Sequence, residues 1–176
     1  MKKLLVLILT LVLGVVAFAE KFEKPVLLTS IGQSADLQMA NVLMKKAGVE
    51  NTLNKSITAK ELTDQKTLVL VIGGSSKGLG AAGIKVEDEL ERTDKLIKAA
   101  KEKGMKLVGL HIGGQPRRGD LSDKFVFAAA PQCDYLIVVE DGNKDGAFTK
   151  MSTEKNIKLV LVPKISEAVN PLKEIF

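Results

Sequence analysis

Hydroxyl, imidazole and carboxylate side chains that could support hydrolysis stand beside glycine-rich segments of this sequence. His111 is the single histidine, and it ends an apolar run that is followed by Ile112-Gly113-Gly114. A serine hydroxyl activated by an imidazole, with a carboxylate orienting that imidazole, is the arrangement of many acyl-transfer enzymes. The candidate residues are Ser75, with Ser30, Ser34 and Ser76 as alternative hydroxyls, His111 as the base and Asp141 as the orienting carboxylate. The nucleophile-elbow pattern Gly-x-Ser-x-Gly is missing, since the residue after Ser75-Ser76 is a lysine.

The stretch 71–80, Val-Ile-Gly-Gly-Ser-Ser-Lys-Gly-Leu-Gly, indicates a second kind of chemistry, the binding of an anion. It follows the apolar run Thr67–Val71 and precedes a helical pattern. A glycine-rich turn between a strand and a helix lets backbone N–H groups converge on a negative charge. The pattern therefore predicts a ligand site without identifying the ligand.

The elements that must position these residues follow from the alternation of apolar runs and helical patterns. The expected strands are Pro25–Ile31, Thr67–Ile72, Met105–Ile112, Tyr135–Val139 and Ile157–Val162, with a weak strand at Thr52–Ile57. Apolar runs without alternation are typical of a parallel sheet that is covered on both faces. We expect a three-layer α/β/α sandwich, Rossmann-like or flavodoxin-like, with about five mostly parallel strands in an order like 2-1-3-4-5.

Helical patterns fill the intervals between these strands. Ser34 is expected to cap a helix that ends at Gly48, and the charged stretch Val86–Lys103 is expected to form another. Further helices are expected over 122–130 and 165–176, with a short one near 152–156.

The expected topology gathers the polar loops at one edge of the sheet. Ligands of open parallel sheets bind outside the carboxyl ends of the strands, at the point where the strand order reverses. Helix N-termini and cationic side chains in these loops favour a carboxylate or a phosphate. The expected ligand-binding residues are Ser30, Gln33, Ser34, Gly74, Ser75, Ser76, Lys77, Gly78, His111, Gly113, Arg117 and Arg118.

The first residues indicate export. A basic start, an apolar core from Leu4 to Val16 and the small-x-small signal Ala17-Phe18-Ala19 form a secretory signal peptide over 1–19. The core is short for a membrane span. We expect one domain over 20–176, without a stable membrane span after cleavage and located in the periplasm or outside the cell.

The composition of the chain limits the classes of partner that we expect. Removal of Lys2 and Lys3 lowers the net charge from +5 to +3, and aromatic residues make up 4% of the chain, so nucleic acid is not expected. Cys133 cannot form an intrachain disulfide, and it is expected to be a buried apolar residue. A His/Cys metal site and a bound cofactor are not expected either.

Two sets of segments in the sequence resemble known protein families. The spacing of Gly74, Gly78 and Gly80 resembles the cofactor loop of short-chain dehydrogenases, but Val139 stands where the lysine of that family's Tyr-x-x-x-Lys would follow Tyr135. The segments 29–36, 73–84, 111–119 and 122–125 are similar, in order, to a bacterial family of exported proteins of unknown function. That resemblance implies a compact exported α/β domain and no particular activity.

Three functions follow as hypotheses. The favoured one is an exported protein that binds a small anionic solute, as an accessory to uptake or sensing through a transporter or another envelope partner. The first alternative is an exported hydrolase or transferase that uses a serine hydroxyl with His111 as the base. The second alternative is an envelope protein whose loops contact another protein.

Overall fold

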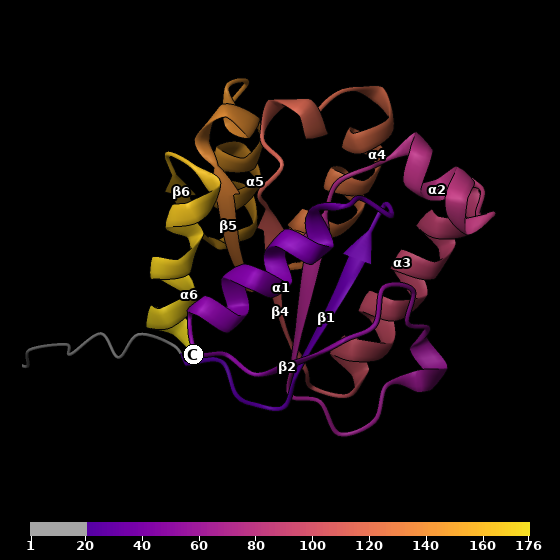
Figure 1. The fold of residues 1–176 in the computed structure, drawn as a ribbon, viewed down its shortest axis with the longest axis horizontal. Helices are drawn as coiled ribbons and strands as arrows, with labels where there is room; N and C mark the ends of the chain where they lie inside the picture. Colours follow the sequence, from indigo (N-terminus) through magenta and orange to yellow (C-terminus); the bar gives the residue numbers. More distant parts are fainter. Residues whose placement is uncertain (1–20) are drawn as a thin grey trace, which may run out of the picture.

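Six parallel strands form one open sheet in the computed structural model, which describes residues 21–176 (Figure 1). The strands are β1 (Val26–Ile31), β2 (Asn51–Leu53), β3 (Thr67–Ile72), β4 (Lys106–His111), β5 (Tyr135–Val139) and β6 (Lys158–Val162). Their order is β2-β1-β3-β4-β5-β6, so the predicted order is confirmed and a sixth strand extends it at one edge. The predicted signal peptide over 1–19 lies outside the described residues.

The central strands are apolar along their whole length because both faces of the sheet are covered. Every residue of β1, β3 and β5 is buried. β2 is the exception: it has three residues, none of them buried, at an edge of the sheet. The segment predicted as a weak strand over Thr52–Ile57 therefore has strand geometry only at its start.

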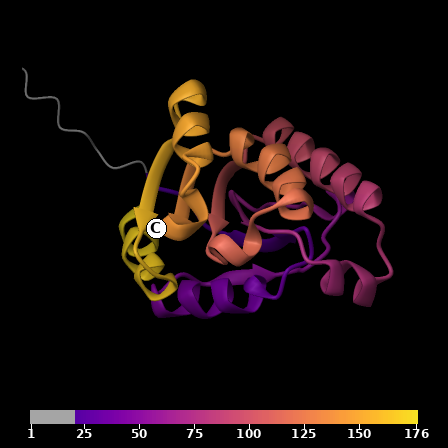
Figure 2. The same cartoon turned by 90° about the horizontal axis from the view of Figure 1, so that it is seen from above.

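The helices make the two outer layers, as the view along the sheet shows (Figure 2). They are α1 (Asp36–Lys46), α2 (Ser76–Ala82), α3 (Val86–Glu102), α4 (Asp120–Ala129), α5 (Ala147–Lys155) and α6 (Val169–Ile175). One apolar core joins α1 and α6 to one face of the sheet, and the other joins α3, α4 and α5 to the opposite face. The predicted three-layer sandwich is confirmed. Within residues 21–176, no helix combines the length and the apolar character needed to cross a membrane.

The start of α1 differs from the prediction. Ser34 does not cap this helix: α1 begins at Asp36, its N-cap is Ala35, and no side chain accepts a hydrogen bond there. The reason lies in the preceding turn, where Gly32 and Gln33 both have positive φ angles, 95° and 61°. This turn leaves Ser34 buried inside the loop instead of at the end of the helix.

Cys133 is buried, as expected from the sequence. The residue is 5% exposed, and its thiol lies 3.5 Å from the carbonyl oxygen of Ala129. Burial raises the pKa of this thiol well above its ordinary value, so the side chain acts as a small apolar group.

Candidate functional site

The loops that leave β1 and β3 lie side by side at the carboxyl edge of the sheet. Gln33 and Gly74 form an isolated antiparallel bridge. The Gly73 amide donates to the Ile31 carbonyl at 2.9 Å, and the Ser75 amide donates to the Gly32 carbonyl at the same distance. Because the strand order reverses between β1 and β3, the two loops meet at the position where open α/β sheets bind ligands.

The glycine-rich loop uses its backbone donors within the fold. The Gly74 amide donates to Ser122 Oγ at 2.7 Å, and the Gly78 amide donates to Ser75 Oγ at 3.0 Å, so Ser75 caps α2. A Cβ atom at Gly78 would lie 1.9 Å from the Gln33 carbonyl oxygen. These glycines thus allow two loop backbones to approach closely. Ser76 and Lys77 are exposed beside them.

A buried ion pair under the β1–α1 loop was not predicted from the sequence. Glu89, which is fully buried, accepts hydrogen bonds from the Gly32 amide at 3.0 Å and from Gln33 Nε2 at 3.1 Å. Arg92 contacts both carboxylate oxygens of Glu89, at 2.7 and 2.8 Å. It also donates to the carbonyl oxygens of Ile57 and Ser30. The pair therefore fixes the loop from the α3 side of the sheet.

Sequence periodicity offered one signal for this pair. Glu89 and Arg92 are three residues apart and precede Thr93, Leu96 and Ile97 on the inward face of α3. Residues three apart on a helix are neighbours. The charged character of the helix suggested a solvated face, and the loop that these two residues bind is more than 50 positions away in the chain.

Arg117 lies across the ends of β3 and β4. A Cβ atom at Gly73 would lie 3.4 to 3.5 Å from the side-chain carbons of Arg117, and one at Gly113 would lie 2.1 Å from its Cγ. Arg117 Nε is 2.9 Å from Asp36 Oδ2, in the first turn of α1. The side chains of Arg117 and Asp36 are 27% and 17% exposed. The two glycines therefore make room for a half-exposed ion pair over the point where the strand order reverses.

Arg118 points elsewhere and holds the adjoining loops together. Its guanidinium pairs with Asp123 at 2.7 Å and with Asp145 at 2.7 Å, and it donates to the Gly142 carbonyl. It also stands 5.5 Å from the centre of the Phe148 ring. The hydrogen bonds from Arg118 lower the pKa of Asp145 to about 2. Arg118 and Lys144 line a hollow of about 360 Å³ together with three aspartates, so negative side chains outnumber positive ones there.

His111 lies on the opposite face of the sheet from Ser30. Its ring is 4.9 Å from that of Phe148, in the core under α3, α4 and α5. Ser30 follows Val26 and Leu28, which face α1, with the period of two that alternation along a strand requires. The sheet therefore separates this serine hydroxyl from the imidazole.

The hydrogen bonds of His111 also differ from those of a catalytic base. Nδ1 is 3.0 Å from the Ile72 carbonyl oxygen, which can only accept, so this nitrogen carries the proton. Burial lowers the pKa of His111 and keeps the ring neutral. Asp141 Oδ1 accepts from the Gln115 amide at 3.3 Å. Within residues 21–176, no hydrogen bond joins His111 to a serine or to Asp141.

Four buried side-chain atoms lack hydrogen-bond partners in the part of the chain that the structure describes. They are Ser30 Oγ, Ser34 Oγ, His111 Nε2 and Asn51 Oδ1. The first three lie at the carboxyl ends of β1 and β4 or just after them. Buried polar groups are nearly always paired, so each of these unpartnered atoms calls for an explanation.

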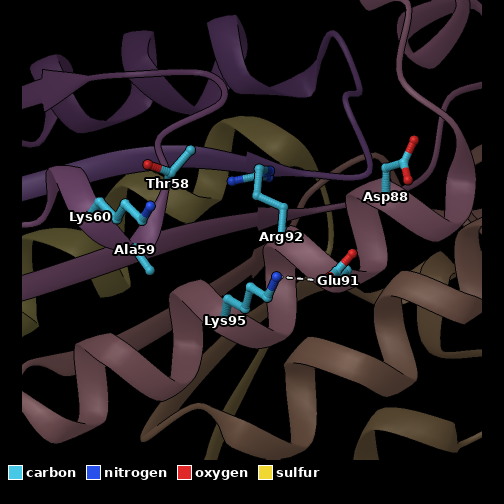
Figure 3. Close-up of a pocket in the computed structure, with 7 residues that line it drawn as sticks. All are labelled: Thr58, Ala59, Lys60, Asp88, Glu91, Arg92 and Lys95. Carbon is cyan, nitrogen blue, oxygen red and sulfur yellow. Dashed lines mark hydrogen bonds and ion pairs between the residues drawn. The ribbon is translucent and has the colours of Figure 1, made fainter.

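A surface hollow of about 370 Å³ lies between the 3-10 turn η1 (Ala59–Glu61) and α3 (Figure 3). Glu91 and Lys95 pair with each other on its wall, and Arg92 turns inward to β1. The charges of Glu91, Lys95 and Arg92 are therefore already paired within the protein. No group of three or more potential metal ligands occurs among residues 21–176.

Comparison with known proteins assigns a family. The model for "Domain of unknown function (DUF6305)" matches residues 23–176. No curated protein matches the sequence.

Two solved structures are distantly similar. The psychrotrophic esterase EstA from a Pseudoalteromonas species, inhibited by monoethylphosphonate, is 14% identical, with a TM-score of 0.37 over 78% of this chain and 75% of that chain. A protein from Desulfitobacterium hafniense, proposed to be lipolytic and of the G-D-S-L family, is 12% identical, with a TM-score of 0.36 over 77% of this chain and 75% of that chain.

Proposed function

We propose that this chain, which belongs to the DUF6305 family, is an exported protein that binds a small anionic solute. In this proposal the signal peptide directs secretion, and the mature protein presents its solute to a transporter or to another envelope partner. The binding site is the carboxyl edge of the sheet between β1, β3 and α1.

The observation that carries the proposal is the set of unpartnered buried hydroxyls in the β1–α1 segment. Ser30 and Ser34 are 0% and 1% exposed, and neither Oγ atom has a hydrogen-bond partner in the structure. An unmade hydrogen bond of a buried group costs about 1–3 kcal/mol. A bound solute with acceptor oxygens would satisfy both hydroxyls.

The charges beside these hydroxyls favour an anion. Arg117 lies over the strand ends, and Lys77 is exposed in the first turn of α2, which follows β3. The N-terminus of α1 adds the positive end of a helix dipole at the same place. His111 lies on the other face of the sheet and is therefore not part of the proposed site. The site is formed by the predicted binding residues on the α1 side of the sheet.

A thermal-shift screen with dialysed mature protein and a panel of carboxylic and phosphoric acid solutes tests the proposal. A solute that binds the folded state at about 100 times its Kd should raise the free energy of unfolding by about 2.7 kcal/mol. The double variant Lys77→Ala/Arg117→Ala should lose this stabilisation. The matched control Lys46→Ala/Lys173→Ala removes two exposed positive charges at other places and should keep it. An equal shift in both double variants would place binding elsewhere.

A further inference from the structure

The pairing of Arg117 identifies the class of solute, if the proposed function holds. Within residues 21–176, the guanidinium of Arg117 makes one hydrogen bond, from Nε to Asp36. That of Arg118 makes five. A guanidinium has five N–H donors in a planar fork. Arg117 is thus an arginine held in place by its stem, with most of its donors unused by the protein.

Asp36 occupies the position that an external anion would take. Its carboxylate stands at the first residue of α1, where the helix dipole favours a negative charge. Ser34, with its unpartnered hydroxyl, is two residues before it in the chain. Arginine and the helix N-terminus therefore meet at a place that is now filled by a carboxylate of the protein itself.

The ion pair is weak enough to exchange. Both side chains reach solvent, and partly exposed pairs contribute about 0–1 kcal/mol to stability. The Arg117 stem lies against Gly73 and Gly113, so it has contacts besides the one with Asp36. An incoming carboxylate therefore needs only to take the place of the Asp36 carboxylate beside Arg117.

We infer that the site takes a small carboxylic acid, whose carboxylate displaces Asp36 from Arg117. A carboxylate fits the planar fork of arginine in two parallel hydrogen bonds. A displaced Asp36 stays within a helical turn of the site and repels a bound dianion more than a monoanion. This charge favours a carboxylate over the dianionic form of phosphate. Asp36 is therefore a specificity-determining residue that competes with the solute.

The test follows the Nε–Hε NMR signal of Arg117 during titration with acetate, with propionate and with inorganic phosphate. The mature chain has three arginines, so the signal can be assigned with Arg117→Gln. Both carboxylates should shift the signal, and Asp36→Asn should bind them about two- to fivefold more tightly, because the internal competitor is gone. Asp36→Ser serves as a second variant, and Asp120→Asn, at the first residue of α4, is the matched control.

The outcomes separate this inference from the proposed function. Carboxylate binding that is equal or weaker in both Asp36 variants overturns the competition, while the anion site stands. Binding of phosphate without binding of either carboxylate overturns the solute class and leaves the anion site in place. A lack of response to all three probes in wild type and in the Asp36 variants overturns both proposals.

Discussion

Arg92 Nη2 lies 2.7 Å from Glu89 Oε1, and this ion pair joins α3 to the loop between β1 and α1. Glu89 is fully buried, and the side chain of Arg92 is 12% exposed. The carboxylate holds Gly32 and Gln33 in a turn with two consecutive positive φ angles. The turn that carries Ser34 and leads to Asp36 therefore rests on a pair of charges from a helix on the other face of the sheet.

Replacement of Glu89 by glutamine should destabilise the fold strongly. The guanidinium of Arg92 would stay buried without a counter-charge, and breaking one partner of a buried ion pair costs about 3–5 kcal/mol. Urea denaturation followed by circular dichroism measures the loss. Glu91→Gln on the same helix is the matched control, because Glu91 and its partner Lys95 are exposed, and its effect should stay within about 0.5 kcal/mol. Equal effects of the two substitutions would contradict the assigned role of Glu89.

Two glycines of α2 should respond in opposite directions to substitution by alanine. A Cβ atom at Gly78 would lie 1.9 Å from the Gln33 carbonyl oxygen, so the two loops would have to separate. A Cβ atom at Gly80 would meet nothing within 4 Å. Gly80→Ala should stabilise the protein by about 0.5–1 kcal/mol, since alanine loses less entropy in a helix. Gly78→Ala should lower the melting temperature, and a melting temperature at or above that of wild type would refute the close approach.

Much of the fold follows from local patterns in the sequence. Strands such as Thr67–Ile72 are continuous apolar runs between glycines and charged segments, which is the pattern of a buried parallel strand. The right-handed crossover rule then leaves few orders for these strands, and the predicted order is confirmed. Both predictions depend on neighbours in the chain and on general packing rules.

The candidate site was less predictable because its contacts join distant residues. Ser34 has the residue type and position of a helix cap, but the Gly32–Gln33 turn places it inside the loop. Arg117 and Arg118 are adjacent and alike in sequence. One pairs with α1 and the other with Asp123 and Asp145, because the chain turns between them. No local pattern specifies such partners.

The stability of the protein should fall through His111 as the pH drops below about 6.5. Burial lowers the pKa of His111 below its ordinary value of 6.5. As the pH falls below 6.5, the unfolded chain takes up a proton that the folded protein does not. The free energy of unfolding therefore falls, by up to about 1.4 kcal/mol per pH unit, until the pH reaches the pKa of the folded protein. Above pH 7 this contribution is constant.

Denaturation curves at several pH values, together with an NMR titration of this single histidine, measure the effect. His111→Gln should remove the slope that begins below about pH 6.5. Asp145, whose pKa is about 2, affects the stability only at much lower pH. It therefore does not contribute to the slope near pH 6. A midpoint at or above 6.5 in the folded protein would contradict the burial argument.

Adjacent arginines should have separable roles. Arg118→Ala removes five hydrogen bonds to Asp123, Asp145 and Gly142, and a contact with the Phe148 ring. Hydrogen bonds to charged groups contribute about 1.5–3 kcal/mol each when buried, so a loss of about 2–4 kcal/mol is expected after allowance for the exposure of Asp145. Arg117→Ala removes one half-exposed ion pair and should cost at most about 1 kcal/mol.

Substitution of Arg117 should affect binding more than substitution of Arg118, which is the reverse of their effects on stability. Arg117→Ala should abolish the shift that a carboxylate solute induces, because its unused donors face the proposed site. Arg118→Lys, which keeps the charge and part of the bonding, should preserve this shift while it lowers the melting temperature. Chemical denaturation measures the stability of each variant, and titration with the solute measures its binding. If Arg118→Lys loses binding and Arg117→Ala keeps it, the site lies at the hollow lined by Arg118, Asp123 and Asp141. Arg117 then has no part in binding.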